Sequence, residues 1–163
     1  MTDIRLQRMA KVLVNYSIGV QKGERMAIRA PMIAAPLVRE IYREAVRAGA
    51  LPETFISVPG LPEILFKEGS DEQLKHIPQS QRLIFEEYET MISLWGETNT
   101  KALNNVDHSR VAISQKASHD LMDTYMRRTM EGTLRWVAAL YPTDASAQDL
   151  SLIHISEPTR QAE

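Results

Sequence analysis

Apolar residues near the N-terminus repeat with the period of an α-helix. They occupy positions 6, 9, 10, 13 and 14, while Arg5, Arg8 and Lys11 fall on the opposite side. Spacings of three and four residues give a helix one apolar stripe, so the pattern predicts a helix over 3–16. After a turn at Gly23, the alternation of polar and apolar residues over 25–30 predicts a short strand.

The next segment predicts a helix followed by a second strand. Pro36 suits the first turn of a helix and Gly49 suits the left-handed position beyond a helix end, so we expect a helix over 34–48. The β-branched and aromatic run 54–58 predicts a strand. On the solvent side of the helix we expect two ion pairs, Glu40 with Arg43 and Glu44 with Arg47.

The second half of the chain continues this alternation. Residues 62–87 predict two or three short helices, broken near Gly69 and at Pro78, before a strand at 90–95. A last strand is expected at 134–140.

Between these strands the sequence predicts one long helix over 108–131. Asp107 or Ser109 can cap its start, and Gly132 suits its end. Its spacing predicts a buried side made of Ala117, Leu121, Met122, Tyr125, Met126, Thr129 and Met130. We also expect three large apolar residues of the strands in the core, namely Met91, Trp95 and Trp136.

The connections between the strands determine the expected fold class. They are far too long for hairpins, so strands centred near Ile28, Ile56, Ile92 and Val137 should lie parallel and be joined by crossovers. The sequence therefore predicts an α/β fold, a mostly parallel sheet with helices on both faces.

Composition and charge narrow the class of protein. A chain of 163 residues with 44% hydrophobic and 25% charged residues is typical of one globular domain. The net charge of −2 provides no basic field, so neither nucleic acid nor a membrane is an expected partner. The absence of cysteine excludes disulfides, a thiol nucleophile and thiolate metal ligands. With no signal-like apolar segment at its N-terminus, we expect a cytoplasmic protein.

The loops after the strands offer one candidate binding site. The turn 30–36 holds no glycine, which excludes a dinucleotide fingerprint or a P-loop there. Because ligand crevices form at the carboxyl ends of parallel strands, the better candidate is the loop after the third strand. Its side chains Glu97, Thr98 and Asn99 offer hydrogen bonds to a small molecule. The alternative interpretation is a surface loop whose polar groups satisfy its own backbone.

The remaining polar residues do not define a catalytic site. His119 and Asp123 are spaced as a two-ligand helix pair, which a solvated helix face also explains, and His76 precedes an expected helix end. The acidic positions 86, 87 and 89 do not project to one point and are expected on a charged outer face. We therefore assign no catalytic residue and no metal ligand in this chain.

Several stretches of the sequence resemble the N-terminal part of the aminopeptidase T family, the AmpS-like thermophilic metallo-aminopeptidases. The resemblance is collinear over about residues 1–149 and rests on Leu13 to Val20, Gly23 to Arg25, Ala35 to Arg39, Ile41 to Glu44, Arg47 to Gly49, Pro59 to Leu61, Glu63 to Leu65, Gly69 to Leu74, Leu103 to Asp107, Met126 to Arg128, Leu134 to Trp136 and Tyr141 to Gln148.

This resemblance implies a two-domain enzyme that removes N-terminal amino acids from peptides. It further implies a homodimer and a pair of divalent metals, zinc, cobalt or magnesium, held in the C-terminal domain. On this view residues 1–149 form an N-terminal domain that lacks the metal site. The preferred N-terminal residue and the physiological metal do not follow from the sequence.

The last residues do not continue the resemblance. Residues 150–160 are similar to the in-frame translation of a sequencing adapter, and 161–163 would follow from a sample barcode. We therefore expect 150–163 to be a tail unrelated to the domain, which predicts few contacts for Ile153 and Ile155. The alternative hypothesis is a free-standing α/β binding or interaction domain that ends naturally near residue 149.

Overall fold

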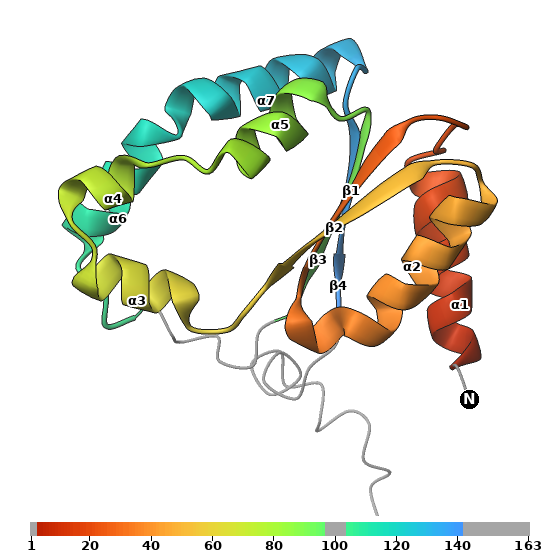
Figure 1. Ribbon diagram of the computed structural model, residues 1–163, viewed down its shortest axis with the longest axis horizontal. Helices are drawn as coiled ribbons and strands as arrows, with labels where there is room; N and C mark the ends of the chain where they lie inside the picture. The colour runs from red at the N-terminus through yellow and green to blue at the C-terminus, as the bar shows by residue number, and fades with distance from the viewer. Residues whose placement is uncertain (1–2, 97–103, 142–163) are drawn as a thin grey trace, which may run out of the picture.

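The protein folds around one four-stranded sheet, all of whose strands are parallel. The computed structural model describes residues 3–96 and 104–141. The strands lie in the order β2-β1-β3-β4, and their arrows in Figure 1 point the same way. This confirms the predicted α/β class and parallel topology. The strand bounds are Arg25–Pro31 (β1), Leu51–Ser57 (β2), Thr90–Trp95 (β3) and Arg135–Leu140 (β4).

Two helices cover one face of the sheet. The first is α1 (Ile4–Lys11), which continues as a π-helical segment (η1, Val12–Ser17). The helix predicted over 3–16 is therefore present, but its second half is π-helical rather than α-helical. A 3₁₀ turn (η2, Met32–Ala34) leads from β1 into α2 (Ala35–Arg47). Figure 1 shows α1 and α2 together on the same side of the strands.

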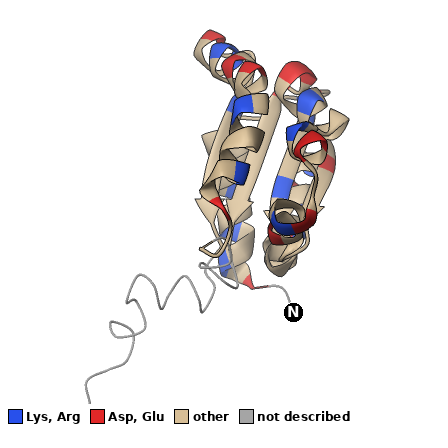
Figure 2. Ribbon diagram, turned by 90° about the vertical axis from the view of Figure 1, so that its left-hand side faces the viewer, with Lys and Arg blue, Asp and Glu red and all other residues tan. Residues whose placement is uncertain are grey.

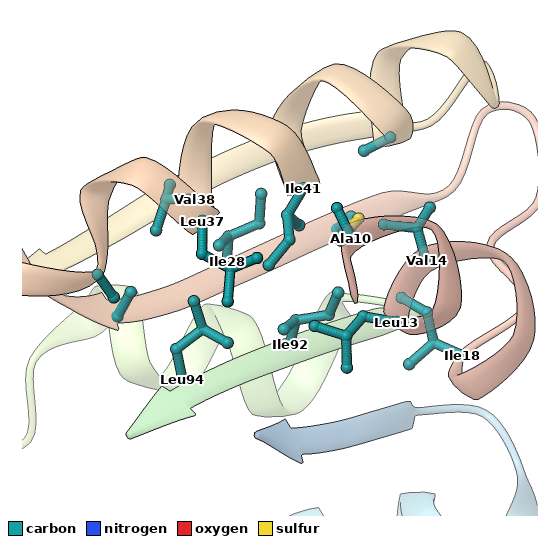
Figure 3. Packing of buried hydrophobic residues seen from close by; sticks show 14 of the residues in the cluster. Ala10, Leu13, Val14, Ile18, Ile28, Leu37, Val38, Ile41, Ile92 and Leu94 are labelled. Atoms are coloured by element: carbon teal, nitrogen blue, oxygen red, sulfur yellow. The ribbon is translucent and has the colours of Figure 1, made fainter. Parts of the chain in front are cut away.

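The larger apolar core lies between this helical layer and the sheet. Leu37 and Ile41 of α2 are fully buried, as is Val14 of η1, and they pack toward Ile28 and Ile92 of the central strands (Figure 3). β1 is buried on nearly its whole length rather than on alternate residues, because helices cover both faces of a parallel sheet.

The remaining helices lie on the other side of the sheet (Figure 1). They are α3 (Leu61–Glu68), α4 (Asp71–Lys75), α5 (Gln79–Glu87), α6 (His108–Ala117) and α7 (His119–Glu131). Of these, α5 and α7 pack against the second face of the sheet. A smaller core here joins α5, α7 and the sheet through Ala27, Ile84, Phe85, Tyr88, Met91, Leu121 and Leu134. The three helices between β2 and β3 confirm the predicted breaks near Gly69 and at Pro78. In Figure 2, which faces this side, basic and acidic residues are interspersed along the helices.

The predicted long helix over 108–131 is wrong in its continuity. It divides at Ser118, whose N–H donates to the Ser114 carbonyl at 3.1 Å and whose hydroxyl donates to the same oxygen at 3.0 Å. Asp107, one of the two expected caps, accepts from the Ser109 N–H at 2.9 Å, and Gly132 ends α7 with φ +73°. The break is in the backbone of Ser118, whose ψ of −1° ends α6 before α7 begins at His119.

The predicted buried side of that helix is wrong at its three methionines, while Ala117, Tyr125 and Thr129 are partly buried. Leu121 is buried, but Met122, Met126 and Met130 are exposed, the last by 86%. Trp95 and Trp136, expected in the core, are likewise exposed, whereas Met91 is buried. Trp136 lies on β4, which is an edge strand within the described residues. Trp95 is the last residue of β3, and its side chain lines a cavity at the carboxyl edge of the sheet.

Two further expectations need correction. Glu40 and Glu44, predicted on the solvent side of α2, are buried, while their partners Arg43 and Arg47 reach from solvent to bind them. The strand predicted over 54–58 is β2, which begins three residues earlier at Leu51. It includes Pro52, which an edge strand tolerates because one of its sides makes no ladder bonds.

Candidate functional site

A cavity among the described residues lies at the carboxyl edge of the sheet. It has a volume of about 680 Å³ and is lined from the ends of three strands and from the start of α5. The strand after β1 in the chain, β2, pairs with one edge of β1, and the following strand, β3, pairs with its opposite edge. The order of the strands therefore reverses between β1 and β3. Such a switch point is where open parallel sheets form ligand crevices.

One row of side chains forms the floor of the cavity. Arg29 of β1 pairs in register with Phe55 of β2 and with Ser93 of β3, and all three line the cavity. Because facing residues of paired strands share one side of the sheet, these side chains lie side by side on the face that α5 covers. The Arg29 guanidinium lies over the Phe85 ring, 5.8 Å from its centroid.

Arg29 is the charged member of the cavity lining among the described residues. Burial lowers the pKa of its guanidinium from the ordinary value, and only the nearby Tyr125 opposes that effect. Two other partly buried arginines have close partners. Arg128 donates to the carbonyls of Phe85 and Tyr88, and Arg135 binds Glu24 at 2.6 Å. For Arg29, the described residues supply no hydrogen-bond acceptor.

The candidate loop predicted from the sequence, Glu97, Thr98 and Asn99, lies outside the described residues. The two residues directly before it, Trp95 and Gly96, do line the cavity. The role of the three loop residues stays a prediction. Arg29 was missed from the sequence, although a cation in a short strand flanked by apolar residues is a recognisable signal of a buried charge.

The other sequence candidates do not meet at the cavity. His119 Nε2 and Asp123 Oδ2 lie 3.7 Å apart on α7, with both side chains exposed. His76 caps the C-terminal end of α4 and is exposed. Within residues 3–96 and 104–141, no three His, Asp or Glu side chains are placed to hold a metal ion.

The acidic positions near the end of α5 serve a structural purpose. Glu86 and Glu87 are exposed, as expected for a charged outer face, and Glu89 is half-buried. Glu87 and Glu89 also bind Arg25 at the start of β1, at 3.1 and 3.3 Å. Glu86 lies 3.7 Å from Arg82 on the same helix. Glu87 and Glu89 therefore join the end of α5 and the entry to β3 to β1, and within the described residues the three carboxylates do not form a divalent cation site.

The cavity is suited to binding. Its described lining combines one cation, hydroxyls and aromatic or aliphatic surfaces, and offers no acidic residue or histidine as a base. Fold and cavity together define an open parallel α/β domain with a ligand-sized crevice at its switch point. No described helix is both long and apolar enough to span a bilayer.

Comparisons with known proteins identify the family. The family model described as thermophilic metalloprotease (M29) matches residues 2–155, and the chain belongs to this family. It is 28% identical over 148 residues to Aminopeptidase 2 of Geobacillus stearothermophilus, covering 88% of this chain and 36% of that protein.

A solved structure supports the fold. The chain is similar to wild-type AmpT from Thermus thermophilus with a TM-score of 0.71 and 21% identity, covering 86% of this chain and 36% of that one. The chain therefore spans only about a third of the length of the relatives it matches.

Proposed function

We propose that residues 1–149 are the N-terminal α/β domain of a metal-dependent aminopeptidase that releases N-terminal amino acids from peptides. The match of the M29 family model to residues 2–155 is the observation that carries this proposal. The partial coverage of both relatives supports a domain of a longer enzyme. Residues 150–163 are proposed to lie outside the domain, as their likeness to a translated adapter suggests.

The metal ions would be held elsewhere in the complete enzyme. A metalloprotease of this family needs a divalent metal, for which we propose zinc, cobalt or magnesium. Residues 3–96 and 104–141 contain no group of three ligands, so this part of the chain does not fit the role of a metal centre. We further propose that the complete enzyme is a cytoplasmic homodimer and that this domain contributes scaffold to it.

A binding domain without peptidase activity is the second candidate. The cavity at the carboxyl edge favours it, because the described lining offers a cation, hydroxyls and apolar walls without a catalytic base. An independent read of the gene beyond codon 149 separates the two hypotheses. A continuing frame rich in acidic residues and histidine supports the enzyme, whereas a stop codon there supports the binding domain.

A peptidase assay tests the proposal on proteins. The chain and the product of the complete gene are each incubated with leucine p-nitroanilide and zinc, cobalt or magnesium. We expect chelator-sensitive release of p-nitroaniline by the longer product and none by the chain. Turnover by the chain itself would contradict the division of roles, and inactivity of the longer product on a panel of aminoacyl anilides would contradict the proposed activity.

A further inference from the structure

The inference starts from an arginine whose charge has no partner among the described residues. Arg29 projects from the central strand on the side of α5, in register between Phe55 and Ser93. Its guanidinium contacts the face of Phe85, and neither a carboxylate nor a carbonyl of the described chain accepts a hydrogen bond from it. A partly buried cation costs desolvation energy, so an unpaired one at a cavity indicates a role in binding.

The cavity around Arg29 has the size and chemistry of a small-molecule site. Its 680 Å³ lie within the range of ligand pockets. Hydroxyls of Ser57, Ser80 and Ser93 line it beside the apolar surfaces of Ile56, Ile84 and Trp95. No aspartate or glutamate occurs in the described lining to neutralise Arg29. An anion with an apolar portion therefore matches the wall better than a cation or a sugar.

We propose that this cavity binds a small organic carboxylate with an apolar side chain, and that the carboxylate pairs with Arg29 while the apolar part lies against Trp95 and Ile84. A planar guanidinium matches a carboxylate with two parallel hydrogen bonds. The proposal goes beyond the peptidase activity and does not depend on it.

A carboxylate fits this site better than a phosphate. A phosphate group at a strand-to-helix turn is usually held by backbone amides that glycine lets approach closely. Here β1 ends at Pro31 and a 3₁₀ segment follows at once, and residues 30–36 contain no glycine. One guanidinium with hydroxyls balances a single negative charge, and the apolar walls disfavour a strongly hydrated dianion.

The N-terminal end of α5 adds a weaker attraction for an anion. Pro78 is its N-terminal cap and provides no side-chain hydrogen bond, and Ser80 and Gln81 of its first turn line the cavity. The partial positive charge at a helix N-terminus favours an anion nearby. It supplements Arg29, which supplies the full charge.

Trp95 provides a direct readout of binding. The full chain is prepared with Trp136→Phe, leaving Trp95 as its indole reporter, and titrated with N-acetyl-leucine and with N-acetyl-leucinamide. These probes differ at the carboxylate alone, and neither carries the free amino group that an aminopeptidase needs. Failure of this test is therefore distinct from failure of the proposed peptidase.

We expect N-acetyl-leucine to change Trp95 fluorescence saturably and the amide to bind about tenfold more weakly or worse. Arg29→Gln should weaken the binding of N-acetyl-leucine by a similar factor, and Arg29→Lys should retain part of the affinity that Arg29→Gln loses. The matched control is Arg39→Gln, which removes an exposed arginine on α2 and should leave binding unchanged. Circular dichroism of each variant establishes that it is folded.

Three results of the direct titrations would overturn the proposal. They are equal binding of the acid and the amide, unchanged binding in folded Arg29→Gln, and the absence of a saturable response to N-acetyl-leucine. Inorganic phosphate serves as a competitor. Displacement of N-acetyl-leucine by phosphate at lower concentration than by acetate would contradict the carboxylate assignment.

Discussion

Glu89 binds both the backbone and the side chain of Arg25. One carboxylate oxygen accepts the Arg25 backbone N–H at 2.8 Å, and the other accepts the guanidinium at 3.3 Å. The two residues are 64 positions apart, one opening β1 and the other preceding β3. This contact fixes the first amide of the central strand to its neighbour, at the edge of the sheet opposite the cavity.

Removing the charge of Glu89 should destabilise the domain. Glu89→Gln weakens two charge-assisted hydrogen bonds, and because the side chain is partly exposed we expect a loss of about 1 kcal/mol in the free energy of unfolding. Urea denaturation measures it. Glu86→Gln, which affects a 3.7 Å contact on the surface of α5, is the control and should stay within about 0.5 kcal/mol of the parent.

The same contact predicts a pH dependence. Burial of the Glu89 carboxyl acts to raise its pKa, but hydrogen bonds from the backbone and side chain of Arg25 outweigh burial and lower the pKa below the ordinary value of 4.5. A lowered pKa in the folded state gives stability that is present above pH 4.5 and is lost as the pH falls through the folded value. The stability difference between the parent and Glu89→Gln should therefore shrink in acid. A difference that grows on acidification would contradict this assignment.

The two sides of α7 should respond differently to truncation. Leu121 is buried between α5 and the sheet, so Leu121→Ala should cost about 3 kcal/mol. Met130 on the same helix is exposed, and Met130→Ala should change stability by less than about 0.5 kcal/mol. Chemical denaturation of both variants tests this. A loss of stability in Met130→Ala as large as that in Leu121→Ala would contradict the exposure of the methionine side of α7.

Two glycines with positive φ should differ in their tolerance of alanine. Gly132 (φ +73°) has open space where a Cβ would lie, so Gly132→Ala should cost only the left-handed strain of about 1 kcal/mol. At Gly49 (φ +80°) the new Cβ would lie 2.9 Å from Cγ of Lys22, which adds a steric cost to the same strain. We expect Gly49→Ala to have the lower melting temperature.

The unpaired charge of Arg29 should lower the stability of the domain relative to a variant with an apolar residue at this position. Arg29→Leu removes a desolvated cation that has no acceptor among the described residues, and we expect unchanged or higher stability, by about 1 kcal/mol. Differential scanning calorimetry without added carboxylate measures it. A clear loss of stability would show that the arginine is a structural element rather than a binding residue.

The strands and their parallel order could be predicted because local patterns and connection lengths determine them. Apolar runs around Ile28 and Ile92, separated by long connections, allow few other topologies. The burial of α7 could not be predicted in the same way, since a helical stripe such as Met122, Met126 and Met130 does not say whether a neighbour covers it. Which stripe is covered depends on the number and order of strands beneath the helix.

A cavity lies at the edge of the sheet that the sequence favoured, whereas the loop residues Glu97, Thr98 and Asn99 stay a prediction. The expected edge of the sheet holds the cavity, because the carboxyl ends of parallel strands meet there. The importance of Arg29 emerges only from the register that puts Phe55 and Ser93 beside it and from the helix that covers it. Such neighbours come from distant parts of the chain, and no local spacing encodes them.

Metal binding tests the central claim most directly, namely that this chain is an M29-family domain whose metal centre lies elsewhere in the complete enzyme. The chain and the complete gene product are equilibrated with zinc, dialysed and analysed for bound metal, with catalytic activity followed in parallel. We predict no stoichiometric zinc on the chain and about two ions per complete protein, as two-metal hydrolysis requires. Tight stoichiometric zinc on the chain, or a complete protein that is active after its metal is removed, would contradict the account.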